Sequence, residues 1–362
     1  MTPAQQAQMS AHVRAIAQLL HADAKAEGLP MATLGEIEQT VRHQLQTHVS
    51  PGIGPFFIQT DYPESCESPR RIISLLGELW LGPKQAKALS VKPRIKYSPY
   101  LEQCCLRMCA KAAYQQAETD VAMLTGIRVS AKTQERMVKR ATLPEAVSHE
   151  LVTEMALDGG MVRVRTPKGQ SSEWRQYHAI RLNRNQIGMA WFKSPSSLLA
   201  WITTLPIGSL LYALGDGHCG IWSLFEQMAI PGTVDEILDW FHLKENLYKV
   251  EASSQQLEVI ADALWEGQLS TAKRMLEAID TDSAKRFRGY LNRHTGRIPN
   301  YRYYQLEGLP IGSGPVESLV KQIDARVQIS GAQWDARSLP QMLKLRCAYI
   351  NEQLDVISSP RE

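Results

Sequence analysis

The stretch LLYALGDGHCGIWSLFEQ, from Leu210 to Gln227, carries the loop GDGHCG between a strand-like run and an apolar-periodic segment. Gly215, Gly217 and Gly220 have the spacing of the dinucleotide-binding fingerprint, in which glycines make room for a pyrophosphate at a helix N-terminus. Asp216, however, would place a carboxylate where that negatively charged group has to lie. The order of the surrounding elements therefore decides whether this loop binds a cofactor or presents an acid.

The segments on either side of the loop do not follow the order of a dinucleotide-binding domain. From Val152 the pattern has period two, and VTEMALDGGMVRVR, WRQYHAIRL and QIGMAWF predict three successive antiparallel strands. A helix, the strand that leads into the loop, a second helix and a strand near Asp239 are expected next. A dinucleotide fold carries its glycine loop after the first strand. The order observed here is ribonuclease H-like, so we expect an α/β fold with a mixed sheet of that type.

Three acids stand at special places in this predicted sheet. Neighbouring strands would bring Asp158, in LDGG, and Asp216 to one edge, although Asp-Gly is also the commonest tight-turn dipeptide. Glu317 falls in the first turn of a helix opened by Gly314 and Pro315, where a carboxylate also suits the helix dipole. A trio of this kind can hold two divalent cations for phosphodiester chemistry. Mg²⁺ suits carboxylate and water ligands, with Mn²⁺ able to replace it.

Composition and charge favour a polyanionic partner. The chain of 362 residues is 44% hydrophobic and 21% charged, with a formal net charge of +3, and its length supports two or three domains. Residues 84–140 contain twelve Lys or Arg against four Asp or Glu, typical of a polyanion-binding surface or of a solvated basic face. The uncharged run over residues 194–215 is broken by Pro206 and Gly208, so we expect no membrane span there.

The six cysteines and the N-terminus indicate a cytoplasmic protein. No Cys-x-x-Cys spacing occurs, which favours a reducing compartment. Cys105 and Cys109 share a predicted helix face, but no histidine lies near them, so core cysteines are expected rather than a zinc site. The N-terminal segment is amphipathic without the apolar core of a signal peptide.

The N-terminal part is predicted to be mainly helical. Helices are expected over residues 4–26 and 34–48, able to pair with each other or with a second copy of the chain, followed by a loop at SPGIGPFF (residues 50–57). The run RRIISLLGELWLG (residues 70–82) predicts a strand pair.

A helix-turn-helix is predicted next. A long helix is expected from Pro99 through Leu124, then a tight turn at Gly126 and a short helix capped by Ser130. Two helices joined in this way have the layout of a DNA reader. The DNA-binding candidates on the second helix are Lys132, Arg136 and Lys139.

The segment AKRFRGYLNRHTGRIPNYRYYQ, Ala284 to Gln305, contains six basic residues, five aromatic residues and no acid. Alternating cations and rings suit phosphate contact and base stacking. The aromatic side chains can equally dock this segment onto the core. The DNA-binding candidates here are Arg286, Arg288, Arg293 and Arg297.

Four ordered motifs, LDGGMVRVR, GDGHCGIW, ILDWFHLKENL and PIGSGPVES with the following SGAQWDARSLPQMLKLR, resemble ISKra-type insertion-sequence transposases of the Mutator-like DDE group. The resemblance covers residue 152 onward and, more weakly, the predicted helix-turn-helix. It implies Asp158, Asp216 and Glu317 as a metal-binding catalytic triad for DNA transposition, with a helical insertion before Glu317. It also implies double-stranded DNA, at element ends and target, as partner, a homodimer or higher oligomer on that DNA, and a bacterial, nucleoid-associated location away from membranes.

The motif Asp239-x-x-His242 stands where relatives carry a Cys-x-x-His or Asp-x-x-His pair. These residues are expected to support the active site, or, for His242, to be a hydrogen-bonded strand-end residue. The N-terminal part lacks the Cys-rich, zinc-like segments of many members, so a catalytically inactive DNA-binding relative is also compatible with the sequence. So are an NAD-dependent oxidoreductase built on GDGHCG and a metal-dependent hydrolase of small phosphates that would use Asp216, His218, Asp239 and His242.

The predicted domain organisation has five parts. A helical region (1–65) precedes the helix-turn-helix region (66–148). The ribonuclease H-like core begins at 149–242, is interrupted by a helical insertion at 243–307, and ends in C-terminal helices at 308–362.

Overall fold

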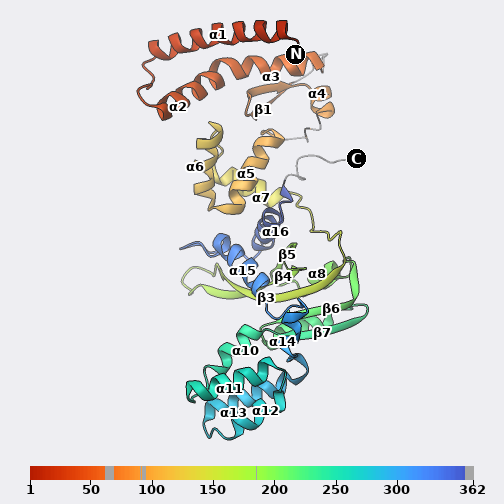
Figure 1. Ribbon diagram of the computed structural model, residues 1–362. Coiled ribbons are helices and arrows are strands. Elements are labelled where there is room, and N and C mark those ends of the chain that lie inside the picture. Colours follow the sequence, from red (N-terminus) through yellow and green to blue (C-terminus); the bar gives the residue numbers. More distant parts are fainter. Residues whose placement is uncertain (62–68, 90, 92–94, 185, 355–362) are drawn as a thin grey trace. The chain divides into compact units, whose positions relative to one another are not determined.

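The computed structural model describes residues 1–61, 69–89, 91, 95–184 and 186–354. Two compact units can be recognised among these residues, Met1–Arg140 and Ala141–Leu354 (Figure 1). Among the helices so described, none combines the length and the apolar character needed to cross a bilayer.

The first unit begins with helices α1 (Pro3–Ala26), α2 (Leu34–Gln44) and α3 (Ser50–Asp61), with a π-helical turn, η1 (Leu45–Val49), joining the last two. The loop predicted over residues 50–57 is therefore wrong. Ile58 of α3 packs against the apolar core of a strand hairpin, so burial outweighs the Gly and Pro residues that predicted a loop. Strands β1 (Arg70–Ser74) and β2 (Gly77–Leu81) form that hairpin and confirm the predicted strand pair; helix α4 (Pro83–Ala88) follows.

Three further helices complete this unit. The single helix predicted from Pro99 through Leu124 is wrong, because it is two helices, α5 (Pro99–Lys111) and α6 (Tyr114–Thr125). The backbone is extended at Ala112, so the chain turns at two alanines that carry no breaker signal. The turn lets α5 and α6 pack against each other and against α7 (Ala131–Arg140).

The cysteines of α5 belong to this packing. Cys105 and Cys109 are both fully buried. Cys109 Sγ donates a hydrogen bond to Gln134 Oε1 of α7 (3.1 Å), and burial raises the pKa of the Cys105 thiol to about 12. These are the properties of core thiols, as the sequence predicts. Cys66 lies outside the described residues.

The second unit is built on a mixed five-stranded sheet in the order β5-β4-β3-β6-β7. Strands β3, β4 and β5 are antiparallel neighbours, whereas β6 and β7 run parallel to β3. Helix α8 (Pro195–Ile202) connects β5 to β6, and α9 (Cys219–Gln227) connects β6 to β7, so the predicted order of elements is confirmed. The strands are β3 (Val152–Val164), β4 (Glu173–Leu182), β5 (Ile187–Trp191), β6 (Ile207–Gly215) and β7 (Thr233–Leu238).

A run of helices interrupts the chain after β7, and two more helices close the unit. In Figure 1 the run gathers beyond β6 and β7. It consists of α10 (Trp240–Leu247), α11 (Ser254–Trp265), α12 (Leu269–Glu277), α13 (Asp282–Arg293), a 3₁₀ turn η2 (Thr295–Arg297) and α14 (Tyr301–Leu306). Helices α15 (Gly314–Val327) and α16 (Leu339–Ile350) then return to the sheet, α15 against β3 and β4 and α16 against β5.

The contact between α15 and the sheet explains a glycine in the LDGG motif. Tyr177 of β4 is fully buried, and its hydroxyl donates a hydrogen bond to Asp324 Oδ1 of α15 (2.8 Å). A Cβ atom at Gly160, opposite Tyr177 in β3, would overlap the Tyr177 ring. Gly160 therefore allows the tyrosine to cross the strand and fix the helix that carries Glu317.

Candidate functional site

The sheet register brings Asp158 and Asp216 to the same level. Ala156 of β3 pairs with Leu214 of β6 in parallel. Continuing that register by two residues places Asp158 opposite Asp216, which follows the last residue of β6. Asp158 lies inside the continuous strand β3, so it is not a tight-turn residue.

A third acid, Asp239, directly follows the end of β7. Gly215 pairs with Leu238, and the backbone N–H of Asp239 donates a hydrogen bond to the Gly215 carbonyl (2.9 Å). Asp239 therefore stands opposite Asp216, one strand further along the sheet. The carboxyl ends of parallel strands are where open α/β sheets commonly bind ligands.

The pKa of Asp158 is raised by burial and by its acidic neighbours. Burial, with smaller contributions from the negative charges of Asp216 and Glu317, raises its pKa to about 6. A hydrogen bond from Gly159 N (2.6 Å) and the nearby His242 act in the opposite sense. Asp158, Asp216 and Glu317 thus interact electrostatically, as a cluster of like charges does when water is partly excluded.

The glycine loop around Asp216 satisfies its own N–H groups. Gly217 has φ +95°, and the turn lets His218 N donate a hydrogen bond to Asp216 Oδ1 (2.8 Å). Gly220 N, at the start of α9, donates to His218 Nδ1 (3.2 Å). A dinucleotide loop needs such groups free to bind phosphate. Here two of them already bind side chains of the loop itself, which argues against the cofactor interpretation of GDGHCG.

The insertion also contacts this loop. The Tyr290 hydroxyl of α13 lies 2.5 Å from the position that a Cβ atom would take at Gly217. Burial raises the pKa of Tyr290 to about 12, and the charges of Asp216 and Asp239 act in the same direction. Tyr290 therefore fills the space that glycine leaves and holds α13 against the Asp216 loop.

Asp239 is fully buried, and both of its carboxylate oxygens accept hydrogen bonds. Oδ1 caps helix α10 by accepting a hydrogen bond from His242 N (2.7 Å). Oδ2 accepts hydrogen bonds from Ser313 N and from Ser313 Oγ, the latter at 2.7 Å. Burial alone would raise the pKa of Asp239, but the hydrogen bonds from His242 and Ser313 outweigh it and hold that pKa below its usual range.

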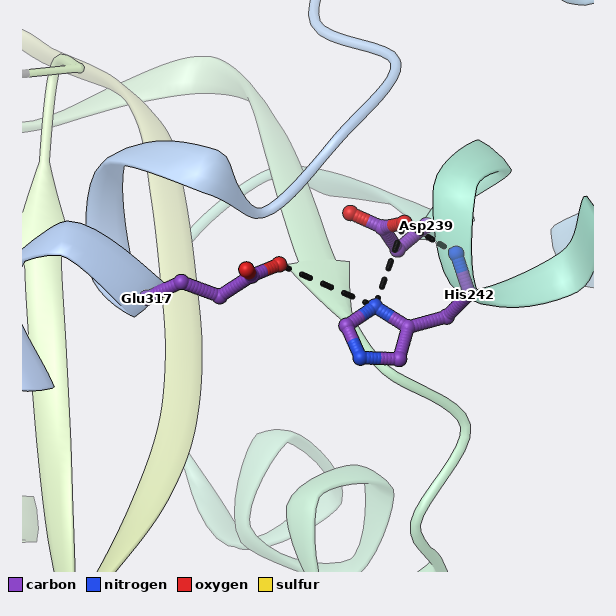
Figure 2. Close-up of side chains that lie close together, drawn as sticks. All are labelled: Asp239, His242 and Glu317. Carbon is purple, nitrogen blue, oxygen red and sulfur yellow. Dashed lines mark hydrogen bonds and ion pairs between the residues drawn. The ribbon is translucent and has the colours of Figure 1, made fainter. Parts of the chain in front are cut away.

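His242 lies between two carboxylates (Figure 2). Its Nδ1 is 3.3 Å from Asp239 Oδ1 and 3.7 Å from Glu317 Oε1. The hydrogen bond with Asp239 and the surrounding negative charge raise the pKa of His242 to about 9. His242 belongs to the first turn of α10, so its interpretation as a strand-end residue is wrong.

Asp239, His242 and Glu317 can hold a metal ion as judged by proximity. One ligand atom from each residue lies within 4.8 Å of the others, and among the described residues this is the group with that property. The hydrogen bonds of Asp239 compete with direct ligation, because both of its oxygens already accept donors. Asp239 is better suited to hold its neighbours in place.

A scan against protein-family models and a search of curated proteins found no match to this chain. The chemistry of the site is therefore inferred from its own residues. These are three acids at one level of the sheet, within β3 and directly after β6 and β7, and a histidine and a glutamate from two flanking helices.

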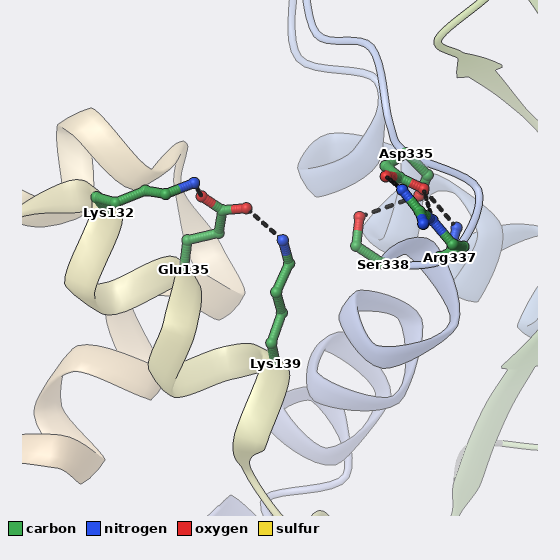
Figure 3. A network of polar contacts seen from close by, with 6 residues as sticks. All are labelled: Lys132, Glu135, Lys139, Asp335, Arg337 and Ser338. Carbon is green, nitrogen blue, oxygen red and sulfur yellow. Dashed lines mark hydrogen bonds and ion pairs between the residues drawn. The ribbon is translucent and has the colours of Figure 1, made fainter.

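The basic side chains of α7 are partly neutralised within the helix. Glu135 accepts hydrogen bonds from Lys132 Nζ (2.9 Å) and Lys139 Nζ (2.6 Å), as Figure 3 shows. Arg136 is exposed on the same helix. The turn that precedes α7 contains Gly126 with φ +74°, as the sequence predicts.

The four arginines predicted to bind DNA from the insertion differ in their surroundings. Arg286 and Arg293 are exposed on α13, whereas Arg288 forms an ion pair with Glu277 (3.6 Å). Arg297 is the least suited to bind DNA, because its Nε lies 2.5 Å from Glu236 Oε2 and its guanidinium stacks over Trp222.

Two tyrosines of the same segment dock the insertion. Tyr301 is fully buried and its hydroxyl donates to the Leu238 carbonyl (2.7 Å), while the Tyr304 hydroxyl donates to Asp235. Both acceptors belong to β7. These two aromatic side chains therefore hold the insertion on the core instead of facing solvent as a stacking surface for bases.

Sequence reasoning missed Ser313. Its hydroxyl donates to Asp239, as described above, and lies 3.1 Å from Glu317 Oε1. The signal was present in IGSGP, because serine directly before a helix is a typical N-cap. In the structure this side chain makes no cap hydrogen bond and contacts the two acids instead.

Proposed function

We propose that this chain is a DDE transposase, which cleaves DNA at the ends of an insertion sequence and transfers the freed 3′-hydroxyl to target DNA. The observation that carries the proposal is the placement of two acids at one level of the sheet, Asp158 within β3 and Asp216 directly after β6, together with the packing against β3 of helix α15, which carries Glu317 in its first turn. The strand order β5-β4-β3-β6-β7 with its antiparallel and parallel pairs supports a ribonuclease H-like core. The four sequence motifs supply the resemblance.

The donor set suits magnesium. Asp158, Asp216 and Glu317 offer carboxylate oxygens, which Mg²⁺ prefers, and Asp239 is left to structural hydrogen bonds. Bound divalent cations would supply charge stabilisation and an activated attacking oxygen for phosphodiester cleavage. Mn²⁺ would serve in the same ligands.

The remaining residues of the site orient the glutamate. Asp239 holds Ser313 by its backbone N–H and its hydroxyl, and Ser313 lies four residues before Glu317. The same hydroxyl reaches Glu317 Oε1, so the carboxylate is fixed from the N-terminus of its own helix. His242 lies beside both acids, where its positive charge reduces their mutual repulsion.

The direct test uses DNA that carries the sequences flanking the gene. We expect Mg²⁺-dependent nicking at a defined position, a free 3′-hydroxyl, and joining of that end to a second DNA. Chelation of the divalent cation should stop cleavage. Binding to these ends without cleavage in either Mg²⁺ or Mn²⁺ would instead identify an inactive DNA-binding relative.

We propose that α7 contacts the DNA. Because Glu135 pairs with two of its lysines, one set of substitutions should weaken DNA binding and another should strengthen it. Alanine at Lys132, Arg136 and Lys139 should weaken end binding and reduce the salt dependence of binding by about one phosphate contact for each cation lost. Glu135→Gln should strengthen binding, because it releases two lysines from an ion pair on their own helix. Affinity is measured over a range of salt concentrations. If neither variant changes affinity, recognition of the ends lies elsewhere.

A further inference from the structure

Helix α1 exposes almost its whole length. Of its 24 residues only Ala24 is buried. Met9, Val13 and Ile16 are 51%, 56% and 40% exposed, although all three are large and apolar. An isolated amphipathic helix gains little stability from propensity alone and depends on burying its apolar stripe.

The neighbouring helices of this unit add to the exposed apolar surface. Exposed large hydrophobic side chains continue along α2, η1 and α3, namely Leu34, Ile37, Val41, Leu45, Ile53, Phe56 and Phe57. Together with Met9, Val13, Ile16 and Leu19 of α1 they make eleven. At roughly 100 Å² for each side chain, about half of it exposed, they offer on the order of 500 Å² per chain. This area lies toward the upper end of the largest apolar patch of a typical monomer, roughly 300–600 Å². Twice this area, about 1,000 Å², reaches the lower limit for a specific interface.

The spacing of the α1 stripe is symmetric about its own centre. Met9, Val13 and Ile16 are exposed and Leu20 is half-buried, and these four residues are separated by intervals of four, three and four. When the helix is reversed, this pattern superimposes on itself. A two-fold axis between Val13 and Ile16 therefore pairs Val13 with the partner's Ile16, and Met9 with the partner's Leu20, as an isologous contact requires.

The charges of the stripe are compatible with such pairing. Between Met9 and Leu20 the one formally charged residue is Arg14, which is not a member of the stripe. Covering the stripe therefore buries no carboxylate and no ammonium group.

We propose that α1 pairs antiparallel with α1 of a second copy of this chain, and that the stripe Met9–Leu20 forms the centre of the dimer interface. The exposed apolar side chains of α2, η1 and α3 add to the area available for this contact. The dimer forms without DNA, so its existence does not rest on the proposed catalytic function.

Mass measured by light scattering in the absence of DNA tests the interface. We expect the wild-type chain to have twice the chain mass of 40.6 kDa at micromolar concentration. Val13→Glu combined with Ile16→Glu should halve the measured mass. Ala11→Glu combined with Gln18→Glu is the matched control, because both residues are exposed and lie on the opposite side of α1. A monomeric wild type, or a dimer that survives Val13→Glu with Ile16→Glu, would overturn the proposal.

A mixing experiment tests the antiparallel register. Its readout is recovery of the dimer, which misfolded variants would not give. Val13→Glu and Ile16→Lys chains should each be monomeric alone. Mixed together they should recover the dimer mass, because the register pairs the new glutamate with the partner's new lysine and restores Val13 to the partner's Ile16. In a parallel dimer these charges would not meet. Absence of recovery, with both chains helical by circular dichroism, would rule out this register.

Discussion

Asp216→Asn is expected to reduce Mg²⁺-dependent DNA cleavage by roughly 1,000-fold or more while leaving DNA binding intact. The amide keeps the hydrogen bond that His218 N donates at this position, so the loop should retain its shape. It removes the negative charge, however, and an amide oxygen is a much weaker ligand for magnesium than a carboxylate. The measurement is nicking and strand transfer beside a binding assay on the same DNA.

The same loss should follow from Asp158→Asn and from Glu317→Gln, because residues that act as one unit have strongly non-additive effects. Asp262→Asn is a suitable control, since Asp262 is an exposed acid on α11 in the same unit. If Asp216→Asn cleaves at the rate of the wild type, Asp216 is only a turn residue and the DDE proposal fails. If all three variants lose DNA binding as well, the acids maintain the fold and their catalytic role is unsupported.

The largest effect on stability is expected at Asp239. Asp239→Ala should lower the free energy of unfolding by about 3–5 kcal/mol, because it removes the cap of α10, leaves the Ser313 N–H without its acceptor and takes away the carboxylate that pairs with His242. Urea denaturation measures the change. Ser313→Ala should cost less, about 1–3 kcal/mol, since it keeps the Asp239 carboxylate and the cap.

The lowered pKa of Asp239 gives this prediction a pH dependence. A carboxylate whose pKa is lower in the folded than in the unfolded chain contributes stability above its unfolded pKa and loses it as the pH falls through the folded pKa. The difference in stability between wild type and Asp239→Ala should therefore be largest near neutral pH and shrink in acid. An equal difference at every pH would show that the charge of Asp239 contributes nothing to stability.

The order of strands and helices along the second unit could be predicted, because alternation of apolar and polar residues with period two identifies each strand directly. That Asp158 and Asp216 lie on neighbouring strands followed from that order, but Asp158 lies in the middle of β3 and not at its end, because β3 continues along β4 to Val164. The break between α5 and α6 could not be predicted, because Ala112 and its neighbour Ala113 are good helix formers and tertiary packing decides where the chain turns. The helix α3 was missed for the same reason, as burial against the β hairpin outweighed local turn residues.

The candidate site shows a similar division. Asp158, Asp216 and Glu317 could be proposed as site residues from motifs and position, but the role of Asp239 depends on Ser313, which lies 74 positions away in the sequence. No local pattern connects two residues at that separation. The ion pair that occupies Arg297 likewise depends on Glu236, a residue of a different element.

The contact between Asp239 and Ser313 also bears on how much the length of the helical insertion can vary. Together with the backbone hydrogen bond from Trp240 N to the Ile311 carbonyl (2.9 Å), they fasten both ends of the helical run α10–α14 at one place. Once the ends of a segment are fixed, its length adds only slowly to the entropy of closing it. The helices between these ends can therefore change in length at small entropic cost, as long as Tyr290 keeps its contact with the Asp216 loop and Tyr301 and Tyr304 keep theirs with β7.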